Sequence, residues 1–299
     1  MSNRPSKKRS SSARVQAAAR ANKSSNMPWI IGIGVLLVIG IALIVAVAGG
    51  NSSSGDIVGR KDAPSSLVTK VTTTNDTVVN AVGQGSSTPL PQPINGKSIA
   101  QDGKPGILYL GAEYCPYCAT ERWAMANALS RFGTFTGLKV TNSDPNDTPP
   151  AIRTLSFYKS TYKSDYIVFT PVELQNNSRG TLETPTAAEE SLSQQFSSGG
   201  SIPFIYFDGK YVITGATYSY AVLQGKSWDQ IASAMSDAKS DVAKGAIGAA
   251  NAMTATICIL TDDQPSAACK PTAIQNLEKQ IKAQSSTTTT TNPNSSSNP

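Results

Sequence analysis

Residues 107–118 read ILYLGAEYCPYC, and this stretch decides the fold class. The apolar run from Ile107 to Ala112 predicts a short, buried β-strand. A helix is expected over 116–132, with Pro116 at its first position and Cys115 as the N-cap. Proline fits there because the N–H group of the first helical residue makes no hydrogen bond within the helix. A strand that runs directly into a helix predicts an α/β protein in which helices cover a small sheet.

Two later patterns extend this layout. Residues 202–207, the turn Asp208-Gly209-Lys210 and residues 211–214 predict a β-hairpin. Residues 227–244 have helical spacing and predict a covering helix.

The two cysteines of the CPYC stretch favour thiol chemistry. The Cys115 sulfur would face the free N–H groups and the positive end of the helix dipole, which stabilise a thiolate. Cys118, Met125 and Leu129 share one helical stripe, so Cys118 is expected inside and Cys115 at the exposed tip. The pattern predicts Cys115 as the nucleophile and Cys118 as the resolving thiol, with Pro116 and Tyr117 as active-site neighbours.

The remaining composition narrows the alternatives. The chain contains no histidine, which excludes the usual Ser-His-Asp and Cys-His catalysis. A zinc site would need Cys258 and Cys269, some 140 residues away, and their spacing is poor for zinc. No metal and no cofactor are therefore expected. A static structural disulfide remains the other interpretation of the CPYC pair.

The N-terminal region predicts a membrane anchor. Residues 1–26 carry seven basic residues and no acidic one, which predicts a disordered cytoplasmic tail. An uncharged apolar stretch fills most of 27–49, long enough for one transmembrane helix, and a linker follows over 50–65. A cleaved signal peptide is the alternative. Both interpretations place the following domain, 66–282, outside the cytoplasm.

The two terminal segments account for the positive net charge and for a Ser- and Thr-rich stretch of the chain. Outside residues 1–26 the remaining 19 basic residues face 20 acidic ones, so the net charge of +6 comes from the tail and no nucleic-acid partner is expected. Residues 283–299 are rich in Ser and Thr and predict a disordered tail.

The segment YLGAEYCPYC resembles the active-site strand and helix start of the thioredoxin superfamily. The longer run 106–133, with Glu121-Arg122-Trp123, resembles domain-of-unknown-function family 929, a group of membrane-anchored, thioredoxin-like proteins of actinobacteria and archaea. The resemblance continues through residues 201–204 to Cys258 and Cys269. It implies a thioredoxin-like fold, a central mixed sheet flanked by helices, behind a single transmembrane helix.

The resemblance also implies specific roles. Pro203 would be the cis-proline beside the CPYC motif, and Ile202 would offer its backbone to a substrate strand. Tyr109 stands where many thioredoxins have a buried carboxylate, which leaves Glu113 and Glu121 as the nearest acids. Glu121 is expected to be an exposed helix residue, with a proton relay as the alternative.

The distance from the motif to Pro203 implies an insertion at about 143–198. Its aromatic residues are expected either to cover the cleft or, as the favoured interpretation, to form the core of an added strand and helix; they are Tyr158, Tyr162, Tyr166 and Phe169.

Cys258 and Cys269 have a helix-turn spacing, which predicts a structural disulfide in an oxidising compartment. A second redox pair is the alternative.

The expected function is extracytoplasmic thiol–disulfide exchange on protein substrates, by a single-pass protein of the cell membrane with its N-terminus in the cytoplasm. A membrane redox partner would restore the active-site pair. The rival hypothesis is a non-catalytic thioredoxin-like binding module with structural disulfides.

Overall fold

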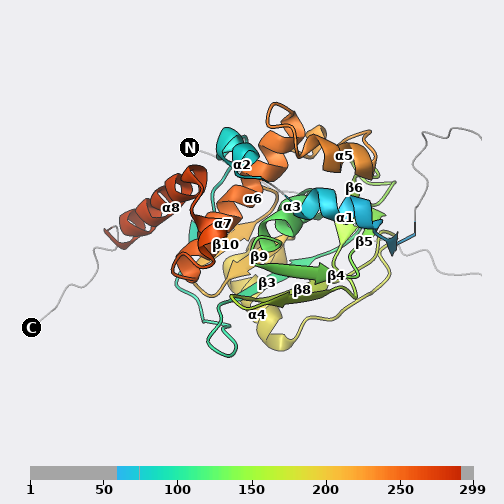
Figure 1. The fold of residues 1–299 in the computed structure, drawn as a ribbon. Helices are drawn as coiled ribbons and strands as arrows, with labels where there is room; N and C mark the ends of the chain where they lie inside the picture. Colours follow the sequence, from blue (N-terminus) through green and yellow to red (C-terminus); the bar gives the residue numbers. More distant parts are fainter. Residues whose placement is uncertain (1–58, 74, 291–299) are drawn as a thin grey trace, which may run out of the picture. The chain divides into compact units, whose positions relative to one another are not determined.

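A computed structural model describes residues 59–73 and 75–290 of the chain. The predicted cytoplasmic tail, the transmembrane helix at 27–49 and most of the linker lie outside the described residues. The described part is a mixed α/β structure (Figure 1).

A five-stranded mixed sheet forms the centre, in the order β2-β10-β9-β3-β8, and its edge strand β2 is the short segment Gln92–Pro93. Strand β3, Gly106–Gly111, lies parallel to β8, Val168–Glu173, and antiparallel to β9, Phe204–Phe207. All residues of β3 and β9 are buried, as expected for apolar strands covered on both faces. The predicted hairpin is confirmed, because β10, Tyr211–Thr214, returns antiparallel to β9.

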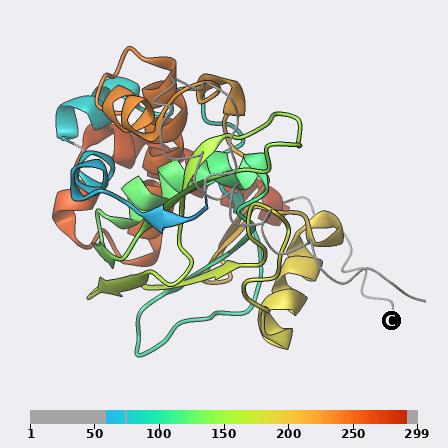
Figure 2. The ribbon, with the colours of Figure 1, turned by 90° about the vertical axis from the view of Figure 1, so that its right-hand side faces the viewer.

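Helices cover both faces of this sheet. One face of the sheet packs in the same hydrophobic cluster as α3, Pro116–Leu129, and α6, Asp241–Leu260. The strand residues on this face include Ile107, Tyr109, Ile205 and Phe207. The alternate positions, such as Leu108 and Phe204, pack with residues of α4, Ala187–Phe196. Accordingly, α4 lies on the opposite side of the strands from α3 and α6 (Figures 1 and 2). The alternation follows from the two-residue period of a strand.

The predicted helix at 116–132 is confirmed with an earlier end, at Leu129. Every residue of α3 is buried except Tyr117. The expectation of one buried stripe is therefore too narrow. The sheet encloses α3 on one side, and other helices, among them α6 and α1, Ser65–Thr72, enclose it on the others.

The single helix predicted over 227–244 is wrong. Two helices occupy this region, α5 at Trp228–Ala234 and α6 at Asp241–Leu260. The break has a local cause, because the Ser240 side chain accepts a hydrogen bond from Ala243 N and starts a new helix. Within the described residues, α6 alone has the length and composition of a membrane span, and 89% of that window is buried in the fold.

The segment expected as an insertion, 143–198, contributes strands to three different sheets and one helix. It contains β6, Arg153–Ser156, β7, Thr161–Ser164, β8 and α4. Strand β6 pairs with β5, Lys139–Asn142, which also pairs with β1, Lys61–Asp62, while β7 pairs with β4, Gly133–Thr136.

Three of the four aromatic residues of this segment pack in or against the core, namely Tyr162, Tyr166 and Phe169, whereas the half-buried Tyr158 lies under Arg60. Tyr162 and Phe169 both contact Phe135, and Phe169 also contacts Phe157 in an edge-to-face arrangement.

The remaining elements lie mostly around α6. They are α1 at Ser65–Thr72, α2 at Asp76–Val82, β2 at Gln92–Pro93, α7 at Ser266–Cys269, α8 at Thr272–Thr290, and the 3-10 turns Ser198–Gly200 and Tyr220–Val222. The described part of the predicted tail, 283–290, is helical and continues α8, whereas 291–299 lie outside the described residues.

Candidate functional site

The CPYC motif lies where β3 ends and α3 begins, as the sequence predicts. Cys115 is the N-cap of α3 and Pro116 occupies its first turn. The Cys118 backbone N–H donates a hydrogen bond of 3.2 Å to the Cys115 Sγ atom. The cysteine side chain thus replaces the oxygen of an ordinary N-cap, and its sulfur lies at the positive end of the helix.

The predicted exposed position of Cys115 is wrong. Cys115 is only 5% exposed and Cys118 is fully buried, whereas Tyr117 between them is 47% exposed. Tyr114, Leu174 and Ile202 pack around the two thiols. The burial of Cys115 follows from this tertiary cover, which the helix pattern alone does not contain.

Ile202 approaches Cys115 from the loop before β9. The Cys115 Sγ atom lies 4.0 Å from the Ile202 carbonyl oxygen. The Ile202–Pro203 peptide bond is cis, as the family resemblance implies. The structure therefore brings Cys115, Cys118, Ile202 and Pro203 together from two segments of the chain.

The two thiols have opposite electrostatic environments. Hydrogen bonds from the Cys118 side chain and backbone N–H lower the pKa of Cys115, and the charge of Arg122 lowers it further, against an opposing effect of burial. Burial raises the pKa of Cys118 well above its usual value. This asymmetry gives one thiol that forms a thiolate readily and a second that stays protonated.

Arg122 and Glu173 form a buried ion pair behind the motif. Both side chains are fully buried. Arg122 Nε donates to Glu173 Oε1 at 2.8 Å, and Arg122 Nη2 donates to Glu173 Oε2 at 2.6 Å. Sequence reasoning missed both residues as site members. The available signal was the position of Arg122 four residues after Cys118, which places both on one helical face.

Glu113 is held by a different cation. Arg60 donates to both of its carboxylate oxygens, at 2.5 and 3.0 Å, and Ser156 Oγ donates to Oε1 at 2.5 Å. The Glu113 side chain is only 1% exposed. The predicted neighbour of the site is thus a buried, paired residue, and its partner Arg60 lies within the segment expected as a linker, 50–65.

The prediction that Glu121 is exposed is wrong. Its side chain is fully buried, and its Oε1 atom accepts hydrogen bonds from the Thr217 N–H and, at 2.9 Å, from Thr217 Oγ1. Its Oε2 atom has no hydrogen-bond partner among residues 59–73 and 75–290. Burial raises the pKa of Glu121 to about 7.

The outer rim of the site carries two aromatic contacts. Tyr117 meets Tyr220 edge to face, with 5.8 Å between ring centroids. On another side, the Arg179 guanidinium lies 4.1 Å from the Tyr114 ring centroid and forms ion pairs with Asp144 and Asp147. These side chains frame the surface around Cys115.

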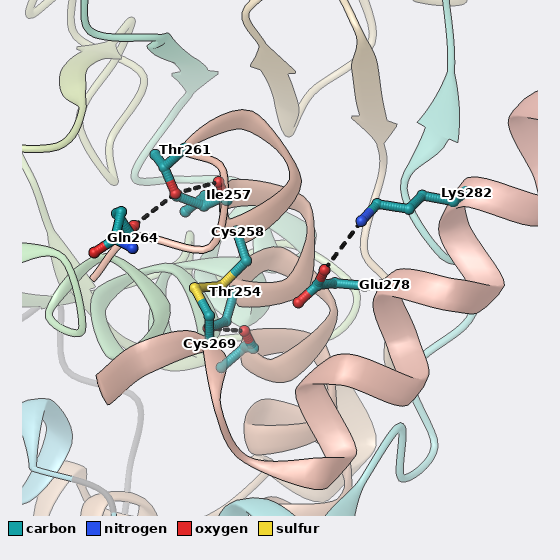
Figure 3. The surroundings of a disulfide bond; sticks show 9 residues. Thr254, Ile257, Cys258, Thr261, Gln264, Cys269, Glu278 and Lys282 are labelled. Carbon is teal, nitrogen blue, oxygen red and sulfur yellow. Dashed lines mark hydrogen bonds and ion pairs between the residues drawn. A yellow bond between two sulfur atoms is a disulfide. The ribbon is translucent and has the colours of Figure 1, made fainter. Parts of the chain in front are cut away.

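The second cysteine pair forms a disulfide, as predicted. Cys258 near the end of α6 is bonded to Cys269 at the end of α7, with a Cα–Cα distance of 5.8 Å (Figure 3). Both residues are buried, and the α8 ion pair between Glu278 and Lys282 lies nearby (Figure 3). Whether the bond is structural or redox-active stays a prediction. The described part of the chain contains no group of three or more metal-ligating side chains.

Comparison with protein families gives one match. Residues 92–199 match the family described as Domain of unknown function (DUF929). The matched segment contains Cys115, Cys118, Arg122 and Glu173, and it confirms the family resemblance over this part of the chain. Its extension to Pro203 and the second cysteine pair stays a prediction. Neither the curated proteins nor the solved structures include a match to the chain.

Proposed function

We propose that the chain is a membrane-anchored, thioredoxin-like thiol–disulfide oxidoreductase with Cys115 as nucleophile and Cys118 as resolving thiol. One observation carries the proposal: Cys115 caps α3 and its sulfur accepts the Cys118 N–H, while Cys118 is buried directly behind it. This arrangement supplies a stabilised thiolate and a second thiol within reach of the same sulfur.

The exchange proceeds in two balanced steps. The Cys115 thiolate attacks a protein disulfide, so that a mixed disulfide forms and one substrate thiolate leaves. The Cys118 thiol then loses its proton and attacks the Cys115 sulfur. The Cys115–Cys118 disulfide forms, the second substrate thiolate leaves, and two electrons have passed to the substrate. Run in reverse, the same steps oxidise a substrate dithiol.

The topology supports a thioredoxin-like fold. The order β3-α3-β8-α4-β9-β10 places a parallel β3–β8 pair beside the antiparallel hairpin β9–β10. The segment before β9 brings Ile202 and Pro203 to the motif, where the resemblance to the thioredoxin superfamily expects them.

The N-terminal sequence favours a domain that lies outside the cytoplasm. The apolar stretch within 27–49, preceded by the basic residues of 1–26, favours a single-pass protein whose domain lies outside the cytoplasm. Substrates would be extracytoplasmic protein thiols or disulfides. Each catalytic cycle changes the oxidation state of the pair, so a membrane redox partner would have to restore it.

The reduction potential of the Cys115–Cys118 pair tests the proposal. The full chain in detergent is equilibrated in glutathione buffers, and the oxidised fraction of the pair is measured by thiol alkylation and mass spectrometry. The Cys115→Ser variant serves as the control. We expect a potential between about −120 and −270 mV, the range of catalytic dithiols. A pair that stays oxidised below about −300 mV behaves as a structural disulfide. That outcome overturns the proposal in favour of a non-catalytic binding module.

A further inference from the structure

A buried cation lies behind the two thiols. Arg122 follows Cys118 by four residues in α3, and this spacing places the two side chains on one helical face. The guanidinium is fully buried, so solvent does not screen its charge. Its charge helps to lower the pKa of Cys115 and opposes part of the rise that burial gives the pKa of Cys118.

The guanidinium is held along one edge. Glu173 accepts hydrogen bonds from Nε and Nη2, and the Glu173 Oε1 atom also accepts the Phe157 N–H at 3.1 Å. The remaining nitrogen, Nη1, is buried and has no hydrogen-bond partner among residues 59–73 and 75–290. A buried donor without a partner is costly and is rarely retained without a role.

We propose that Arg122 is a positioning residue whose charge stabilises the Cys115 thiolate, and that Glu173 orients this charge and limits its strength. The inference rests on the proposed function, in which Cys115 is the nucleophile. Beyond that function, the inference assigns to Arg122 and Glu173 the adjustment of the reduction potential of the Cys115–Cys118 disulfide.

Other groups near the two thiols do not supply this positive charge. Cys118 stabilises the Cys115 thiolate by hydrogen bonds, not by a charge. Tyr109 on β3 and Tyr114 before α3 are ionisable but not cationic, and Arg179 and Asp147 lie beyond Tyr114. Arg179 is the other cation in this set, but it is half exposed and already paired with two carboxylates. Solvent and these partners weaken its effect on the thiol.

The consequence for exchange follows from linkage. A cation that stabilises the thiolate also stabilises the reduced form, which makes the disulfide a stronger oxidant. Removal of the charge is expected to lower the reduction potential of the pair. A tenfold change in the exchange equilibrium corresponds to about 30 mV for this two-electron couple.

Three variants test the inference. Arg122→Met/Glu173→Gln removes both charges, Glu173→Gln leaves the cation without its counter-charge, and Arg122→Lys keeps the positive charge. Arg131→Met is the matched control, because Arg131 is a second, partly buried cation just after α3, and it donates hydrogen bonds to Asn127 of α3 and Asn251 of α6. In each reduced full-length protein in detergent, the iodoacetamide reaction of Cys115 is followed against pH by mass spectrometry.

We expect opposite shifts in the first two variants. The pKa of Cys115 should rise by about one unit in Arg122→Met/Glu173→Gln, with a roughly tenfold slower reaction at acidic pH. It should fall by about half a unit in Glu173→Gln. It should stay near the wild-type value in Arg122→Lys and Arg131→Met. A merely structural role gives no reason for shifts of opposite sign.

Two results overturn the inference: an unchanged pKa in the charge-free double variant, or shifts of the same sign in it and in Glu173→Gln. If the double variant does not fold, the Glu173→Gln protein decides, since an unchanged or raised pKa contradicts the inference. The alkylation reaction needs no protein substrate. Shifted Cys115 pKa values in a protein without exchange activity would therefore reject the proposed function alone. Unchanged Cys115 pKa values in a protein that catalyses exchange would reject only the role of Arg122.

Discussion

Arg60 forms a two-point ion pair with Glu113, which lies two residues before Cys115. The pair joins the start of the described chain to the turn that carries the CPYC motif, across 53 positions of sequence. Arg60 also lies over the ring of Tyr158, 4.3 Å from its centroid. The end of the segment expected as a linker is therefore part of the support of the candidate site.

The first prediction concerns this pair. Arg60→Met should lower the free energy of unfolding by about 2 kcal/mol, because Glu113 would remain buried without its cation. Urea unfolding of the full chain, followed by tryptophan fluorescence, measures the change. The double variant Arg60→Met/Glu113→Gln should recover part of the loss, since it leaves no unpaired charge. A double variant less stable than Arg60→Met would contradict this account.

The second prediction concerns the pH dependence contributed by Glu121. Its pKa is raised by burial from 4.5 to about 7. Below pH 4.5 the carboxyl is protonated in both the folded and the unfolded state, so it contributes no pH dependence. As the pH rises from 4.5 to about 7, the unfolded state releases the proton while the folded state keeps it, so stability falls. Above that range the full penalty, on the order of 3 kcal/mol, remains.

Glu121→Gln should remove this contribution. We expect the variant to unfold with a higher free energy than the wild type at pH 8, by up to about 3 kcal/mol, and with a similar one at pH 4.5. Glu190→Gln, a change at an exposed glutamate of α4, is the control and should change stability little at either pH. Equal effects of Glu121→Gln at both pH values would refute a raised pKa at this position.

The third prediction separates the two interpretations of the Cys258–Cys269 disulfide. The bond closes a loop with a sequence separation of 11 residues. The loop-entropy relation then gives a stabilisation of about 3 kcal/mol. Cys258→Ala/Cys269→Ala should lose about that much stability while keeping the exchange rate at Cys115 in substrate excess. A large loss of exchange rate in a folded variant would instead indicate a second redox pair.

Local patterns predicted a substantial part of the fold and of the site. The apolar strand β3, the start of α3 with Cys115 as N-cap, and the hairpin around Asp208 and Gly209 all follow from residues close in sequence. In each case the governing physics, a covered strand, a proline at the first helical position or a tight turn, acts over a few residues. These elements and the placement of the CPYC pair between β3 and α3 could therefore be predicted, whereas the chemistry of the pair stays a prediction.

The environment of the pair was decided by contacts between distant segments. Glu121 is buried because Thr217 packs against it, 96 positions away, and Arg122 meets Glu173 across 51 positions. The periodicity of α3 gives no sign of these partners, since a helix enclosed on several sides has no polar face to reveal its neighbours. The sequence by itself identified the two CPYC thiols as candidate reactive groups. Tertiary packing decided how buried they are and which charge lies behind them, because burial and low-dielectric electrostatics depend on residues that only folding brings together.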